Sequence, residues 1–473
     1  MTSAEPTAGG AGAVGGPEEA GGAVDRHLRS PGAAPVPAPH VPYWPGRAVD
    51  LRSLAGEQTR LLIPAPFQRE DLAAYTARGG YRPGDEPGKL IEKAEQAGLA
   101  GRGGAAFPIG IKLRSVRDAE GPRYVVANGE EGEPLSVKDR WLLRIRPHLV
   151  LDGLFRAAGA VSAERAYVYL SDPDAAASVR HALAELGDVP LPVEVVRIEP
   201  SYVGGEETAV VRAINGGPAL PVDKPPRPFE SGVGQRPTLI SNVETLANLP
   251  AIEVRGVDAY VQPSRDRQCP GTFLLSLSGA CPAPGLYEVP LGMTLREVAG
   301  QVGGFAGEPR GALMGGYFAG LIGADVLDLP LSYPATKARG TGLGCGAIWV
   351  IAPDECPIAI AADLMAYFER NNARQCGPCI RGTGAMAKVL ERLSRGGVTD
   401  QDIERLTGWS QSLRGRGACA YLDGSANLAA SVFREFSADV AAHRDGQCPT
   451  CAQRQAAGYD RFRLTIEQAP QSH

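Results

Sequence analysis

The sequence predicts an α/β protein built from a parallel sheet, a small strand-rich module and a helical C-terminal region. Between residues 61 and 250, short apolar runs alternate with segments of helical spacing, which is typical of a parallel sheet with crossover helices. Glycine-rich, hairpin-like segments occupy about 270–340, and helical spacing dominates from about 355. The predicted division is a disordered tail at 1–60, an α/β domain at 61–250, a β-grasp domain at 251–345, a helical domain at 346–440 and a cysteine-bearing tail at 441–473.

The elements follow the apolar pattern in order. Residues 1–60 are rich in Gly, Ala and Pro and lack apolar periodicity, so we expect them to be disordered. The runs that follow have the lengths of buried strands and crossover helices. The expected elements are a helix around 90–94, strands at 124–127, 166–170 and 193–198, a helix at 173–187, a hairpin of 273–277 with 286–289, a short helix at 294–298, and helices around 364–368, 386–393, 403–406 and 432–436.

Composition excludes several classes of protein. The net charge of −5 argues against a basic nucleic-acid-binding protein. The chain has no run of about 18 apolar residues, so we do not expect it to span a membrane. No signal peptide is apparent, and nine cysteines, an odd number, do not indicate a disulfide framework. These features predict a cytoplasmic protein.

A glycine-rich loop after the first predicted helix is a candidate anion site. Glycines let backbone amides approach an anion, which Arg or Lys then neutralises. A flexible surface loop has the same pattern, so both interpretations remain open. The candidate residues are Gly101, Arg102, Gly103, Gly104, Phe107 and Lys112.

Two acidic loops follow predicted strands, at the edge where parallel sheets bind ligands. Their carboxylates suit ribityl or ribose hydroxyls, although isolated glutamates are usually solvated. A third segment combines a proline-rich lip with an amide that could hold a ring edge. The residues are Glu130, Glu131 and Glu133 after one strand, Tyr202, Gly205, Glu206 and Glu207 after another, and Lys224 and Asn242 in the third segment.

The cysteines suggest a metal centre. Cys376 and Cys379 form a C-x-x-C pair, and with Cys419 they suit an iron–sulfur cluster or zinc, unless they are ordinary thiols. Near the C-terminus lie three further candidate ligands, whereas a closed zinc site needs four. Two interpretations therefore remain open, a partial metal site and a tail that binds no metal. These three are His443, Cys448 and Cys451, and we interpret the others, Cys269, Cys281, Cys345 and Cys356, as isolated structural thiols.

In this order the motifs resemble the flavin-bearing, NADH-oxidising subunit of respiratory complex I and its relatives in NAD-dependent formate dehydrogenases and bifurcating hydrogenases. The resemblance covers about 85–440 and rests on GRGGAAFP, ANGEEGEP, YVGGEETA, RPTLISNVETLANLP, QCGPCIRG and CAYLDGSAN. It implies a Rossmann-like FMN domain, a β-grasp domain of the soluble-ligand-binding type and a helical iron–sulfur bundle. The implied activity is hydride transfer from NADH to FMN, then electron transfer through a 4Fe-4S cluster to an iron–sulfur or membrane redox partner.

The resemblance also implies roles for individual residues. The phosphate side of FMN is assigned to Gly101, Arg102, Gly103 and Lys112. The ribityl chain and ring are assigned to Asn128, Glu130, Gly205, Glu206, Glu207, Ile240, Ser241 and Asn242. The dinucleotide is assigned to Phe107, Glu133, Tyr202, Glu207 and Lys224, and the cluster to Cys376, Cys379 and Cys419.

The chain departs from the family pattern at the cluster. The family motif has three cysteines before the distant fourth, but here Ala373 occupies the first position. A three-thiolate site implies a foreign fourth ligand, a 3Fe-4S cluster or no cluster. Cys448 or Cys451 could substitute only if the tail folds back.

Further departures concern the ligand loops. Ser115 and Arg227 stand where the family stacks adenine between aromatic rings, which predicts weaker dinucleotide binding. Glu130 and Gly132 replace the usual Asp and Ser, and Ala106 replaces a glycine. The alternative function is therefore an electron-transfer adaptor or scaffold of the same fold that no longer oxidises NADH.

Overall fold

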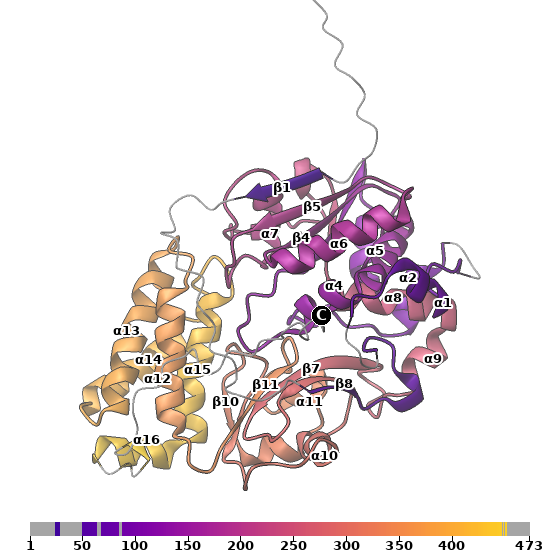
Figure 1. The fold of residues 1–473 in the computed structure, drawn as a ribbon. Coiled ribbons are helices and arrows are strands. Elements are labelled where there is room, and N and C mark those ends of the chain that lie inside the picture. Colours follow the sequence, from indigo (N-terminus) through magenta and orange to yellow (C-terminus); the bar gives the residue numbers. More distant parts are fainter. Residues whose placement is uncertain are drawn as a thin grey trace, which may run out of the picture.

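The computed structural model describes residues 24–28, 50–63, 68–84, 88–446, 448, 450 and 451. This part of the chain contains two sheets with their covering helices, followed by a C-terminal group of helices (Figure 1). The first sheet is wholly parallel, with the order β1-β5-β4-β3-β6, which confirms the predicted parallel α/β sheet. Its strands are β1 (Val24–Leu28), β3 (Arg123–Asn128), β4 (Ala163–Leu170), β5 (Val193–Ile198) and β6 (Thr238–Asn242).

Helices cover both faces of this sheet. Along β3, Val125 and Ala127 join one apolar core, while Val126 between them joins a second core with α7. This alternation is what a strand buried on both faces requires. The helices of this part are α1 (Leu72–Ala77), α2 (Leu90–Gln96), α3 (Ile109–Arg117), α4 (Lys138–Ile145), α5 (Pro147–Val161), α6 (Pro173–Leu186), α7 (Glu207–Ile214), α8 (Val243–Arg255) and α9 (Val257–Val261), with the short 3-10 helices η1 (Gly56–Gln58) and η2 (Val233–Gln235).

The strand order contains a switch point. From β3 the chain moves outward through β4 and β5, and then returns to place β6 on the other side of β3. Asn128 at the end of β3 and Asn242 at the end of β6 are register partners. Open α/β sheets bind ligands outside the carboxyl ends of their strands at such a point.

The second sheet has six strands in the order β10-β9-β11-β7-β8-β2 and mixes parallel with antiparallel pairs. Its β7–β8 hairpin is the one that the sequence predicts. The strands are β2 (Asp50–Ser53), β7 (Thr272–Gly279), β8 (Gly285–Pro290), β9 (Gly311–Leu313), β10 (Leu321–Gly323) and β11 (Ala347–Ile351). The helices beside them are α10 (Leu295–Gln301), η3 (Ala324–Asp328) and α11 (Tyr333–Ala338).

In the described part of the chain, five helices follow β11 and pack on one another (Figure 1, orange to yellow). Leu364, Met386 and Leu428 share one buried core with Trp349 of β11, so these helices also cover a face of the second sheet. The helices are α12 (Pro357–Arg370), α13 (Gly377–Ser394), α14 (Asp400–Ser412), α15 (Tyr421–Glu435) and α16 (Ser437–Arg444).

Two expectations about boundaries are wrong. Within the predicted disordered tail, β1 pairs with β5 and β2 pairs with β8, each in parallel. The predicted helical domain at 346–440 begins with β11, which belongs to the second sheet. Both strands of the tail are short, and their partners lie far away in the sequence, so no local pattern indicates them. Of the predicted tail at 1–60, the structure describes 24–28 and 50–60. Of the predicted tail at 441–473, it describes 441–446, 448, 450 and 451. The other residues of both tails lie outside the described part of the chain.

Candidate functional site

The carboxyl-terminal edge of the parallel sheet gathers most of the predicted ligand residues. The loops that follow β3, β5 and β6 all leave from this edge, because the strands are parallel. Asn128 donates a hydrogen bond from Nδ2 to the carbonyl of Gly205 (2.8 Å), which ties the first acidic loop to the second. The structure therefore brings the two acidic loops together.

Glycines let three backbone segments approach closely here. A Cβ on Gly103 would lie 3.2 Å from Cβ of Asn242, so the glycine-rich turn lies against the end of β6. A Cβ on Gly205 would lie 2.9 Å from the carbonyl oxygen of Glu130. A side chain at Gly132 would meet the backbone of Ser201 and Tyr202 at 2.7 Å, so these two loops lie against each other. Ala106 has a φ of 54°, a left-handed conformation that favours glycine.

Glu130 is a buried carboxylate with unused hydrogen-bonding capacity. Its Oε1 accepts a hydrogen bond from the amide of Ser201 (3.3 Å), and its Oε2 has no partner among the described residues. Burial raises the pKa of Glu130 to about 7, although the hydrogen bonds from Ser171 and Ser201 favour its charged form. A buried acceptor without a donor fits a ligand hydroxyl at this position.

We expect Glu130→Gln to stabilise the ligand-free protein at pH 8 by up to about 3 kcal/mol and to leave its stability at pH 4.5 unchanged. The folded-state pKa lies above the usual value of 4.5, so the unfolded chain loses this proton first. The stability that Glu130 contributes is therefore complete below about pH 4.5 and lost as the pH rises through 7. Thermal midpoints between pH 4.5 and 8 measure the effect. Equal gains at both pH values, or a similar gain for the exposed Glu164→Gln, would contradict it.

A group of lysines and glutamates joins α3, α7 and the proline-rich segment. Nζ of Lys224 lies 2.7 Å from Glu207 and 2.8 Å from Glu206, and Nζ of Lys112 lies 3.9 Å from Glu207. Burial opposes the ionisation of Glu207, but Lys224 and Lys112 hold the pKa of this carboxyl below its usual value. Burial lowers the pKa of Lys112, whose Nζ donates to the carbonyl of Ile240 (3.2 Å).

Two predicted ligand side chains are instead used within the protein. The guanidinium of Arg102 is buried and donates to the carbonyl of Thr272 (3.0 Å) and the hydroxyl of Tyr260 (3.2 Å). Glu131 accepts hydrogen bonds from the amides of Asp139 and Arg140 at the start of α4 (both 3.1 Å). We expected the Arg102 side chain to face a phosphate, but in the structure its guanidinium is bonded to Tyr260 and Thr272.

Asn242 belongs to a buried charge network that the sequence does not indicate. Nζ of Lys138 lies 2.7 Å from Asp139 and 3.0 Å from Glu244, and it donates to Oδ1 of Asn242 (3.2 Å). Although burial opposes its charge, Asp139 and Glu244 raise the pKa of Lys138 above its usual value. Lys138 is fully buried, and it holds the end of β6 in place through Asn242.

Tyr202 connects the acidic loops with the C-terminal helices. Its hydroxyl donates to Oε2 of Glu133 (3.0 Å), which also accepts from the amide of Tyr317 (3.0 Å). Burial raises the pKa of Glu133 to about 7. The Tyr202 ring lies edge-on to Tyr421 and Tyr367, with centroids 5.3 and 5.7 Å apart. The predicted ligand loops therefore pack directly on α12 and α15.

The three predicted cluster cysteines come together. Burial, together with the nearby thiols of Cys376 and Cys419, raises the pKa of Cys379 to about 12. Gln375, next to Cys376, donates to the carbonyl of Pro221 (2.7 Å), so this loop lies on the segment that leads to Lys224. The cysteine group therefore adjoins the proposed ligand region.

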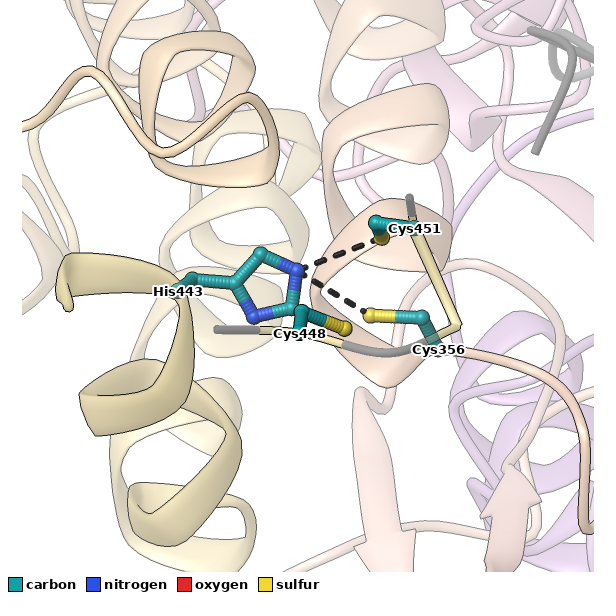
Figure 2. A group of neighbouring side chains, drawn as sticks. All are labelled: Cys356, His443, Cys448 and Cys451. Carbon is teal, nitrogen blue, oxygen red and sulfur yellow. Dashed lines mark hydrogen bonds between the residues drawn. The ribbon is translucent and has the colours of Figure 1, made fainter. Parts of the chain in front are cut away.

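A second cysteine group forms where the sequence left the outcome open. Cys356, His443, Cys448 and Cys451 each offer one ligand atom, and all four atoms lie within 4.8 Å of one another (Figure 2). The interpretation of Cys356 as an isolated thiol is therefore wrong, and the structure places it beside His443, Cys448 and Cys451 as a possible fourth ligand. Cys356 lies 87 residues before His443, so no spacing motif could have identified it.

Comparison with known proteins gives matches over most of the chain. Residues 94–251 match the family model described as the Nuo51 FMN-binding domain, and residues 359–443 match the NADH-ubiquinone oxidoreductase-F iron-sulfur binding region. The chain is 34% identical to an NADH-quinone oxidoreductase F subunit of Rhizobium meliloti, over 80% of this chain and 96% of that protein. It is 32% identical to the corresponding F subunit of Escherichia coli, over 77% of this chain and 88% of that protein.

Hydrogenase components are also similar. The chain is 30% identical to the HndC component of the NADP-reducing hydrogenase of Solidesulfovibrio fructosivorans, over 77% of this chain and 78% of that protein. Among solved structures, an NAD+-reducing [NiFe]-hydrogenase in its H2-reduced state is similar with a TM-score of 0.72 and 28% identity, over 80% of this chain and 68% of that one. None of the described helices combines the length and the apolar character needed to cross a bilayer.

Proposed function

Because this chain belongs to the family of the NADH-quinone oxidoreductase F subunits, we propose that it oxidises NADH through bound FMN and passes the electrons through an iron–sulfur cluster to a partner protein. The observation that carries this proposal is the buried, unpartnered Oε2 of Glu130 at the carboxyl edge of a sheet that matches an FMN-binding model. We further infer that the three parts of the chain correspond to the Rossmann-like, β-grasp and iron–sulfur domains of the family.

The residues at the sheet edge fit FMN. Gly103 and Gly205 let the ligand loops lie close to one another, since a Cβ at either position would press on Asn242 or Glu130. We assign the ribityl hydroxyls to Glu130 and Asn128, and the phosphate to the backbone of the turn at 101–104 with Lys112. The backbone of that turn takes the role because the Arg102 guanidinium is bonded elsewhere.

Bound FMN would supply acceptance of a hydride and release of single electrons. The chain contributes binding, orientation and exclusion of water. Lys138 and Asp139 hold Asn242, and Tyr202 positions Glu133, so the acidic loops are preorganised before any ligand arrives. We assign no acid–base residue to the reaction.

We infer that NADH binds beside α3. Phe107 and Ile111 are 46% and 48% exposed, and Val222 is 41% exposed near the lysine–glutamate group. Exposed apolar side chains next to paired charges suit the faces and phosphates of a dinucleotide. Ser115 has no aromatic ring on which adenine could stack, and its hydroxyl donates back to the carbonyl of Ile111 (2.9 Å). The affinity for the adenine part of the dinucleotide should therefore be modest.

The proposed cluster ligands are Cys376, Cys379 and Cys419. Glu206 and Lys224 both lie close enough to act electrostatically on Cys419, so the cluster would be a near neighbour of the flavin. A set of neighbouring thiols is suited to an iron–sulfur centre, which takes cysteine thiolates as ligands. We propose that the protein is cytoplasmic and peripheral, and that it delivers electrons to an iron–sulfur or membrane redox protein.

Gly205→Val is expected to weaken FMN binding at least about tenfold, because the side chain would displace the backbone of Glu130. Fluorescence titration of the apoprotein with FMN measures this affinity. Gly159→Ala is the matched control, since a Cβ there meets nothing within 4 Å. Unchanged FMN affinity in Gly205→Val would contradict the assignment, as would failure of the parent chain to bind FMN.

Stopped-flow mixing with NADH separates this function from the adaptor that Ser115 and Arg227 suggest. Rapid bleaching of bound flavin by NADH supports oxidation of NADH. A flavin that stays oxidised at millimolar NADH, but is reduced by dithionite, would identify an adaptor instead.

A further inference from the structure

We propose that Cys356, His443, Cys448 and Cys451 form a mononuclear zinc site, separate from the iron–sulfur cluster, that fastens the segment after α16 to the start of α12. Three of these four ligands lie outside the regions that match the FMN and iron–sulfur models, and His443 is the last residue of the second match. The site is therefore additional to the proposed redox machinery.

The four ligand atoms have the spacing of a tetrahedral site. Nε2 of His443 lies 3.4 Å from Sγ of Cys356 and 3.3 Å from Sγ of Cys451 (Figure 2). Zinc bonds of about 2.3 Å to sulfur and 2.0–2.1 Å to nitrogen separate tetrahedral N and S ligands by about 3.6 Å. The spacing also argues against a two-iron cluster, which holds two ligand pairs apart on separate irons.

The histidine is already oriented for a metal. Its Nδ1 lies 2.8 Å from the backbone carbonyl of Asp439, one turn earlier in α16. A carbonyl only accepts hydrogen bonds, so Nδ1 carries the proton and the lone pair of Nε2 faces the sulfurs. His443 and Cys356 are both buried, which fixes the direction of these ligands.

One arginine links the two supports of the site. Nη2 of Arg310 contacts both carboxylate oxygens of Asp439 (2.7 and 2.9 Å), and its Nη1 donates to the carbonyl of Glu355 (3.1 Å). Glu355 immediately precedes Cys356, and the backbone carbonyl of Asp439 accepts from His443. Arg310 therefore holds the helix that carries the histidine against the loop that carries the first cysteine. In metal sites, residues that hydrogen-bond to the ligands or to their backbone commonly fix the orientation of those ligands.

The chemistry of the donors favours zinc. Three thiols and one imidazole are soft and borderline ligands in a closed set of four, which is typical of structural zinc. Hard cations such as Mg2+ and Ca2+ prefer oxygen ligands, and none of the four residues supplies one.

The position of the site separates it from the iron–sulfur cysteines. Cys356 precedes the first residue of α12, whereas Cys376 follows the last residue by a short loop. The 14 residues of α12 span about 20 Å. Cys448 and Cys451 are therefore not the replacement for the missing cysteine at Ala373.

Metal analysis of the full-length chain tests the proposal. We expect about one zinc per chain after gel filtration with a weak chelator, in addition to any iron. Cys451→Ser and His443→Gln should each lower bound zinc by at least about tenfold and leave iron and flavin content unchanged. Cys281→Ser, a buried thiol outside both groups, should retain full zinc. Parent protein without zinc, or full zinc in both ligand variants, would overturn the site.

A second measurement keeps the test decisive if the variants do not fold. Parent protein grown with Co2+ in place of Zn2+ should show the visible bands and sulfur-to-cobalt charge transfer of a tetrahedral three-thiolate site. An octahedral cobalt spectrum, or iron that occupies these cysteines by X-ray absorption, would overturn the assignment to zinc. Flavin content, measured on the same samples, reports separately on the proposed redox function.

Discussion

Lys138→Met is expected to lower the thermal midpoint at pH 8 by about 10 °C, because it leaves buried carboxylates without their cation. Asp139 and Glu244 both lie within 3.0 Å of this ammonium, and all three side chains are buried. Removal of one partner from a buried ion pair costs about 3–5 kcal/mol, and each kcal/mol shifts the midpoint of a domain of this size by about 2–4 °C. Differential scanning calorimetry of the parent and variant measures the loss.

The pH dependence distinguishes this mechanism from a simple packing defect. Burial raises the pKa of Asp139 to about 7, and loss of Lys138 removes the cation that favours its charged form. At pH 5.5 the stranded carboxylate of Asp139 can take up a proton, so the deficit should shrink. Lys388→Met, at an exposed position of α13, should change the midpoint by less than about 2 °C. A deficit that is equal at pH 5.5 and pH 8 would contradict the electrostatic explanation.

Partial rescue by a second substitution gives an independent check. Glu244→Gln in the Lys138→Met background removes one uncompensated charge and keeps an oxygen that can accept from the amide of Leu274 (2.8 Å). We expect the double variant to be more stable than Lys138→Met at pH 8. Additive losses in the double variant would rule out the coupling.

Ala373→Cys is expected to convert the cluster site from three thiolates to four. Ala373 lies in the loop between α12 and α13, three residues before Cys376, and packs on the same apolar core as Cys376 and Cys419. A fourth thiolate should raise iron from about three or fewer atoms per chain to about four, and should slow loss of iron to a chelator. Iron and sulfide assays with electron paramagnetic resonance distinguish the three-iron and four-iron forms.

Ala373→Ser is the matched control for this substitution. Its hydroxyl adds similar volume and polarity but is a poor ligand for iron, so iron content should stay at the parent value. Equal iron content and spectra in Ala373→Cys and the parent would show that this position does not face the cluster. Because the zinc ligands lie at the other end of α12, zinc content should be the same in all three proteins.

Some interactions at the proposed flavin site could not be assigned from the sequence. The glycine-flanked Arg102 has the local pattern of a phosphate ligand, but its guanidinium bonds to Tyr260 and Thr272, which come from distant segments. Lys138 follows an acidic loop and has no motif of its own, although it organises Asn242. Side chains that are buried between domains take roles that depend on partners more than 100 residues away.

Apolar periodicity by itself predicted several local elements of this protein, among them β3, β4, β5 and α6, but it did not indicate α5, α8 or β6. Val125, Val126 and Ala127 are all apolar because a central parallel strand is covered on both faces, and this requirement is visible in a short stretch of sequence. The motif order likewise identified the family, since the glycine turn, the acidic loops and the C-x-x-C pair are each continuous in the chain.

Only the tertiary structure decided which distant residues meet. The pairing of β2 with β8, the Arg310 link and the group of Cys356 with His443 join segments whose spacing follows from the whole fold. Short strands and single ligands carry no periodicity, and their partners are selected by packing of complete sheets and helices. For this reason the sequence showed which candidate ligand side chains are present, while the fold decided which of them meet.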